Sequence, residues 1–168
     1  MMQLFIQLSI LLILMVMALQ DFRCRAISWY AFPLLAVLML LGNKDFNITE
    51  AFINIGLLLI NFGLATLFIS LKNHRFTNLL KSHIGWGDLL MLLCLSLYFS
   101  PVNFFVFYLS SLVFIAIATG TYMLLAKPKN YTIPLAGMQG MLLFACILSA
   151  SLFDVKINNV QWFENYLL

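Results

Sequence analysis

Apolar runs of helix length, separated by short polar stretches, dominate this chain. Of its 168 residues, 64% are hydrophobic and only 9% are charged, whereas soluble domains average about 25% charged residues. A run of about 20 apolar residues is the length that a helix needs to cross a bilayer. Membrane β-barrel strands are shorter and alternate in polarity. The sequence therefore predicts an integral membrane protein with an all-α fold.

Six transmembrane helices are expected, at residues 2–19, 28–41, 50–71, 84–99, 102–126 and 133–153. Pro33 falls in the first turns of the second, and Gly42 follows its last apolar residue, as is common at helix ends. Asn47 and Glu50 resemble a capping pair that opens the third helix. Pro101 separates the fourth helix from the fifth. We expect residues 1–168 to form one membrane-embedded domain.

The basic residues predict the orientation of this bundle. The loops after the first, third and fifth helices hold seven of the nine lysines and arginines: Arg23, Arg25, Lys72, Arg75, Lys81, Lys127 and Lys129. Only Lys44 and Lys156 lie on the other side. Because basic loops stay in the cytoplasm, both termini are expected outside, in a multi-pass protein of the inner (plasma) membrane. The net charge of +3 is small and lies in these loops, so no nucleic-acid partner is expected.

Two aspartates share the cationic face with these basic residues. Asp21 lies just after the C-terminal end of the first apolar run. Asp88 is the last residue of the sequence Gly85-Trp86-Gly87-Asp88, near the N-terminal end of the fourth apolar run. The charge count places both in cytoplasmic loops at the same depth, although they are far apart in sequence. Every other acidic residue falls on the outer side: Asp45, Glu50, Asp154 and Glu164. Ionisable residues at membrane depth are costly and usually functional.

A pair of carboxylates at one site can act as both acid and base. Two like charges close together do not both ionise readily, so one proton belongs to the pair, and such a pair activates water in aspartic proteases. Gly85 and Gly87 are expected to allow unusual backbone geometry or close approach of a substrate strand next to Asp88. A simpler interpretation is that these glycines begin a helix. Similarly, Asp21 alone could be a hydrated carboxylate paired with Arg23 or Arg25.

The remaining reactive side chains indicate no metal or cofactor site. Cys24, Cys94 and Cys146 are widely spaced and form no metal-binding or disulfide pattern. His74 and His83 fall in a polar stretch without a cluster of acidic or cysteine ligands. We therefore expect no cofactor and no metal.

Three segments together resemble the prepilin peptidase family, the membrane aspartic endopeptidases that process type IV prepilins and pseudopilins. Residues 21–27 are similar to the family's D-x-R-x-R-x-I segment, and residues 85–88 to its G-x-G-D motif. Residues 133–137, Ile-Pro-Leu-Ala-Gly, are similar to the I-P-F-G-P stretch that opens the last helix. The segments occur in the family's order, and the resemblance extends over essentially the whole chain.

The resemblance implies a hydrolase in which Asp21 and Asp88 are catalytic and Gly85 and Gly87 complete the motif. It implies a cytoplasmic-side site that removes a basic leader from prepilin-like or pseudopilin-like proteins, without a cofactor. The chain differs from the family at Ser28-Trp29, where Pro-Asn is common, and at Leu90, where Lys is common. The methyltransferase domain of bifunctional members is absent, so peptidase activity without N-methylation is expected.

Two other function classes remain open from the residues alone. A small proton-coupled or cation-coupled transporter would also use an acidic pair at one membrane face. A non-catalytic pilin-assembly protein would keep the fold and bind pilin-like helices in the bilayer. The oligomeric state is not indicated by the sequence.

Overall fold

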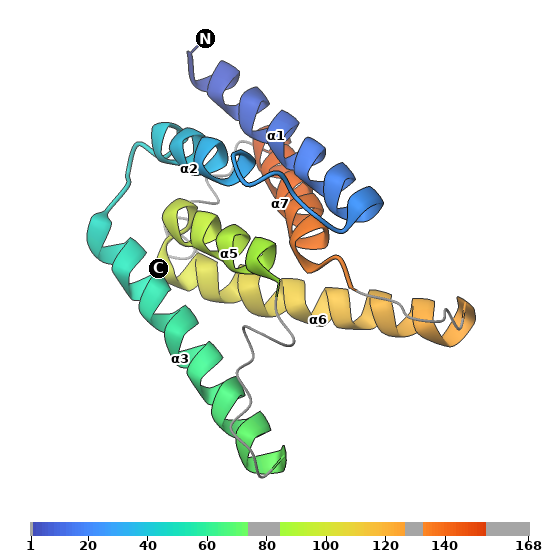
Figure 1. Cartoon of the computed structure of the whole chain (residues 1–168). Coiled ribbons are helices and arrows are strands. Elements are labelled where there is room, and N and C mark those ends of the chain that lie inside the picture. The colour runs from blue at the N-terminus through green and yellow to red at the C-terminus, as the bar shows by residue number, and fades with distance from the viewer. Residues whose placement is uncertain (1, 74–84, 127–132, 154–168) are drawn as a thin grey trace.

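The structure is a computed structural model that describes residues 2–73, 85–126 and 133–153. Within these ranges the regular secondary structure is entirely helical, which confirms the all-α prediction. The helices are α1 (Met2–Cys24), α2 (Ala31–Gly42), α3 (Ile48–Asn73), α5 (Trp86–Tyr98), α6 (Pro101–Ala126) and α7 (Leu135–Leu152) (Figure 1).

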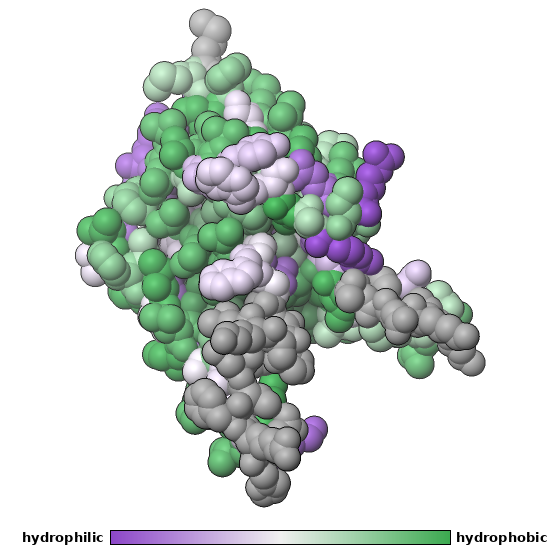
Figure 2. Space-filling view, viewed as in Figure 1, coloured by the Kyte–Doolittle hydropathy of each residue, from purple (hydrophilic) through white to green (hydrophobic). Residues whose placement is uncertain are grey.

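Four of these helices, α1, α3, α6 and α7, are long and apolar enough to cross a membrane. Apolar side chains cover most of the face shown in Figure 2, as expected for a surface that meets lipid. The other two, α2 and α5, have 12 and 13 residues. They extend for only about 18 and 20 Å at the helical rise, less than the hydrocarbon thickness of about 30 Å. The six-span arrangement therefore stays a prediction.

Local sequence signals place the helix ends. The Asn47 side-chain oxygen accepts a hydrogen bond from the backbone N–H of Thr49 at 3.0 Å, so Asn47 caps α3 as predicted. Pro101 is the first residue of α6, a position where the missing N–H of proline has no consequence. Pro33 lies in the first turn of α2. The cap at Asn47 and the place of Pro33 are confirmed, whereas Pro101, expected between two helices, is the first residue of α6.

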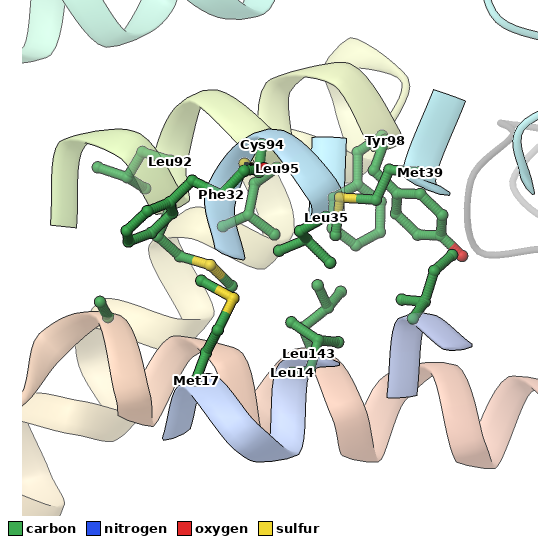
Figure 3. Packing of buried hydrophobic residues seen from close by; sticks show 14 of the residues in the cluster. Leu14, Met17, Phe32, Leu35, Met39, Leu92, Cys94, Leu95, Tyr98 and Leu143 are labelled. Carbon is green, nitrogen blue, oxygen red and sulfur yellow. Dashed lines mark hydrogen bonds between the residues drawn. The ribbon is translucent and has the colours of Figure 1, made fainter. Parts of the chain in front are cut away.

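The closest helix pair is α1 and α7, which run antiparallel side by side (Figure 1). Leu14 of α1 and Leu143 of α7 are fully buried beneath Leu35 of α2 (Figure 3). At Gly140 of α7, an added Cβ would lie 3.8 Å from the backbone oxygen of Leu14. Small residues allow helix backbones to approach closely in membranes. This packing places the end of α1 beside the start of α7.

A polar contact joins α3 to the far end of α5. Asn54 of α3 is fully buried, and its side-chain amide donates to the backbone oxygens of Ser96 at 3.0 Å and Phe99 at 2.8 Å. Carbonyls at a helix C-terminus lack intrahelical partners, and polar side chains commonly connect helices in this way. α3 is therefore attached to α5 at the end that lies away from Asp88.

The structure corrects the predicted placement of Asp21 in a loop after the first helix. The first helix was expected to end at residue 19, but α1 continues to Cys24 and contains Asp21. Asp88 lies in the first turn of α5. α1 extends beyond the apolar run because Asp21 is buried against α7, where its carboxylate accepts a hydrogen bond from the N–H of Gly137. The pair is thus carried by helices, which hold side chains more rigidly than loops.

Candidate active site

Asp21 and Asp88 bind the same helix N-terminus. One carboxylate oxygen of Asp21 (Oδ2) accepts a hydrogen bond from the backbone N–H of Gly137 at 2.7 Å. Oδ1 of Asp88 accepts one from the adjacent N–H of Ala136 at 2.8 Å. Together with the backbone bonds between successive amides, these contacts place the two bonded oxygens at most about 10 Å apart. The pair predicted from the sequence is therefore brought to one place.

The first turn of α7 is suited to hold negative charge. The first amides of a helix have no intrahelical acceptor, and the helix dipole places partial positive charge there. Pro134, at the N-cap position, makes no side-chain cap hydrogen bond. The carboxylates of α1 and α5 bind amides that a capping side chain normally satisfies. The hydrogen bonds that cap α7 are therefore the same hydrogen bonds that bring the two aspartates together.

Asp21 is buried, with 8% of its surface exposed. This excludes the interpretation of Asp21 as a fully hydrated interfacial carboxylate. Its approach to α7 depends on Gly137, because a Cβ built there would lie 2.9 Å from both Oδ2 and Cβ of Asp21. Contacts under 3.0 Å essentially never occur for real Cβ atoms. Gly137 therefore provides the space that this carboxylate occupies.

Asp88 is held at both carboxylate oxygens. In addition to the contact with Ala136, its Oδ2 accepts from the backbone N–H of Gly85 at 3.2 Å. This is the side-chain-to-cap half of a capping box, with Asp88 three residues after the N-cap; glycine has no side chain for the other half. The local G-x-G-D sequence thus orients Asp88 toward α7.

The two motif glycines have different surroundings. A Cβ at Gly85 would lie 3.2 Å from Oδ2 of Asp88, whereas a Cβ at Gly87 would meet only the Phe32 ring at an ordinary 3.7 Å. No glycine in the described residues has a positive φ. The expectation of unusual backbone geometry here is therefore wrong. Close approach to Asp88 is the property that distinguishes Gly85.

The surroundings combine positive charge with exposed aromatic rings. Arg23 and Arg25, which follow Asp21, are exposed. Trp86, beside Asp88, is 72% exposed, and Trp29 is 77% exposed. Tryptophan is enriched where a bilayer meets water, so this composition is typical of a site at the membrane interface.

The sequence interpretation missed the amides of Ala136 and Gly137, which bind the aspartates, and it overlooked Gln139 of the same helix. Backbone amides have no sequence signature. Gln139, however, is a polar residue within an apolar run, a signal that was available. Gln139 is fully buried, and neither its Nε2 nor its Oε1 has a hydrogen-bond partner among the described residues.

No metal-binding group is formed in the part of the chain that the structure describes, in the sense of three clustered His, Cys, Asp or Glu side chains. The three cysteines are free. His74 and His83 lie outside the described residues, as do the basic residues Arg75, Lys81, Lys127, Lys129 and Lys156.

The chain was also compared with known proteins. No protein-family model, curated protein or solved structure matches it. The carboxylates of Asp21 and Asp88 are both bound by neutral backbone donors at adjacent positions of α7. Such a pair can take a proton from water and return one to a leaving group.

Proposed function

We propose that this protein is a membrane aspartic endopeptidase with Asp21 and Asp88 as the catalytic pair. One observation carries the proposal: two aspartates remote in sequence accept hydrogen bonds from consecutive amides at the start of α7. A capping role alone needs only one such side chain. The resemblance of three sequence segments to prepilin peptidases supports the same reaction class.

In the proposed reaction, the pair shares one proton. The ionised carboxylate takes a proton from water as the water oxygen bonds to the scissile carbonyl carbon. The protonated carboxyl gives its proton to the carbonyl oxygen. As this tetrahedral intermediate collapses, the C–N bond breaks and the carboxyl that took the water proton gives it to the leaving amine nitrogen. The other carboxylate takes back a proton from the hydroxyl that becomes the new carbonyl, which restores the pair. The α7 amides orient both carboxylates throughout.

The proposed substrate is a prepilin-like or pseudopilin-like protein with a basic leader and a hydrophobic segment. In this proposal the chain crosses the inner membrane six times with both termini outside, and the pair lies at the cytoplasmic face. Arg23, Arg25 and the exposed rings of Trp29 and Trp86 support that placement. The hydrophobic segment would lie in the bilayer while its leader reaches the pair.

The test is co-expression with a candidate prepilin, with leader removal measured by mass spectrometry. Asp21→Asn and Asp88→Asn keep an oxygen that accepts from α7, so both proteins should remain folded in the membrane. Both should lose cleavage. Asp45→Asn removes an exposed carboxylate distant in sequence from the pair and should cleave normally. Normal cleavage by either Asp21→Asn or Asp88→Asn would refute the proposal.

The same variants separate the two alternatives. A transporter predicts ion flux in proteoliposomes without any peptide cleavage. A non-catalytic assembly protein predicts pilin binding that is unchanged by Asp21→Asn and Asp88→Asn. Carboxylates held on adjacent amides support the peptidase over an assembly protein, which has no need for paired acids.

A further inference from the structure

Gln139 is a fully buried polar side chain on α7 to which the proposed reaction gives no role. Both ends of its carboxamide lack a partner within the described part of the chain. Buried polar groups are nearly always hydrogen-bonded, and an exception indicates a functional group or a bound water. An apolar residue of similar shape would avoid the cost of burying this amide.

Gln139 lies close in sequence to the turn of α7 that binds the acidic pair. Gln139 lies one turn after Ala136, whose N–H binds Asp88. Residues three apart share a helix face, and helical side chains lean toward the N-terminus. A side chain at this position is therefore expected to lean toward the turn that binds the carboxylates. Gln139 makes no direct hydrogen bond to Asp21 or Asp88, so any contact between Gln139 and the pair needs a third group such as a water molecule.

We propose that Gln139 is a third polar residue of this site and that its carboxamide binds the water molecule that the aspartates activate. This inference rests on the proposed peptidase function. A glutamine side chain offers one acceptor and two donors, and a buried water typically makes about three hydrogen bonds. Gln139 and the carboxylates together supply those partners. The Gln139 side chain of α7 and the two aspartates then orient the water together.

The test compares Gln139→Met with Ser100→Ala in the full-length protein. Met has a similar length and is apolar. Ser100, at the junction of α5 and α6, is also buried with an unpartnered side-chain oxygen, and it lies at the opposite end of α5 from Asp88. With a synthetic peptide carrying a basic leader and a hydrophobic segment, Gln139→Met should lower kcat about tenfold or more with KM little changed. Ser100→Ala should keep the wild-type kcat.

A second measurement needs no substrate. Carbodiimide coupling of an amine to Asp21 and Asp88, followed by mass spectrometry, reports the state of the pair directly. Loss of a water-mediated contact should change the coupling rate about threefold or more in Gln139→Met, which corresponds to one hydrogen bond. Ser100→Ala should couple at the wild-type rate.

The outcomes separate this inference from the function on which it rests. Wild-type kcat and coupling in Gln139→Met, with both Asp→Asn variants inactive, overturn the inference alone. A wild-type protein that cleaves nothing overturns the peptidase proposal, and the coupling comparison then still decides whether Gln139 contacts the pair. If Gln139→Met does not fold, Gln139→Asn carries the test, because its shorter carboxamide should also lower kcat. Unchanged kcat in that variant counts against the role.

Discussion

The carboxylate of Asp21, in the last turn of α1, accepts a hydrogen bond from the backbone N–H of Gly137, in the first turn of α7, across 116 positions of sequence. The contact is buried and forms at a glycine, where the absence of a side chain lets the carboxylate approach. It therefore connects the packing of α1 on α7 with the placement of the acidic pair. Changes on either helix should affect activity through this contact.

Gly137→Ala should nearly abolish cleavage while leaving the protein folded. The added Cβ would lie 2.9 Å from Oδ2 of Asp21, so the carboxylate must move. A displacement of about 1 Å can cost on the order of 100-fold in rate. The measurement is kcat on a prepilin peptide together with the thermal midpoint of the purified protein.

Gly120→Ala is the matched control for that change. A Cβ at Gly120 of α6 would have nothing within 4 Å, and alanine in a helix interior is favoured over glycine by about 0.5–1 kcal/mol. Its kcat should equal that of the wild type and its thermal midpoint should not fall. A fully active Gly137→Ala protein would contradict the assignment of Gly137.

The motif glycines should respond differently to alanine. At Gly85 the new Cβ would lie 3.2 Å from Oδ2 of Asp88, and at Gly87 it would make only an ordinary contact with Phe32. Gly85→Ala is therefore expected to reduce kcat by about tenfold through a shifted carboxylate. Gly87→Ala should stay close to wild type. If instead Gly87→Ala alone loses activity, and KM rises, Gly87 provides room for the substrate as the motif suggested.

Asn54→Leu should destabilise the fold without a direct effect on chemistry. It removes both hydrogen bonds to the end of α5 and leaves buried carbonyls unpaired, which costs about 1–3 kcal/mol each. The thermal midpoint should fall, while kcat per folded molecule should be retained. Asn61→Leu is the control, since Asn61 is on the same helix and exposed; its midpoint should not fall. An unaltered midpoint in Asn54→Leu would show that these bonds contribute little.

The sequence predicted the helical fold because apolar runs of this length have few alternatives in a bilayer. It also predicted that Asp21 and Asp88 would lie at one depth, since the basic residues alternate between loops. Two features of the site could not be predicted from the sequence. The partners of the aspartates are backbone amides, which every residue has. The extension of α1 through Asp21 depends on the burial of Asp21 against α7. This is a tertiary effect that the polar local sequence does not indicate.

The lengths of α2 and α5 were also harder to predict. Their apolar runs at residues 28–41 and 84–99 were expected to span the membrane, yet the helices have 12 and 13 residues. Ser28 accepts a backbone hydrogen bond from Ala31, and its N–H donates to the Gln20 side chain, so the chain turns before α2 begins. Such contacts between neighbouring segments have no counterpart in a hydropathy pattern.

The native cysteines test the predicted orientation. Cys24, in the last turn of α1, is exposed, whereas Cys94 is buried and Cys146 is half-buried within α7. If the site faces the cytoplasm, a membrane-impermeant maleimide should label Cys24 in inverted membrane vesicles and not in intact spheroplasts. Cys24→Ser should remove this labelling, and denaturation should make all three thiols reactive. Labelling of Cys24 in intact spheroplasts would place the acidic pair on the outer face, and cleavage of a cytoplasmic leader could not then occur at this site.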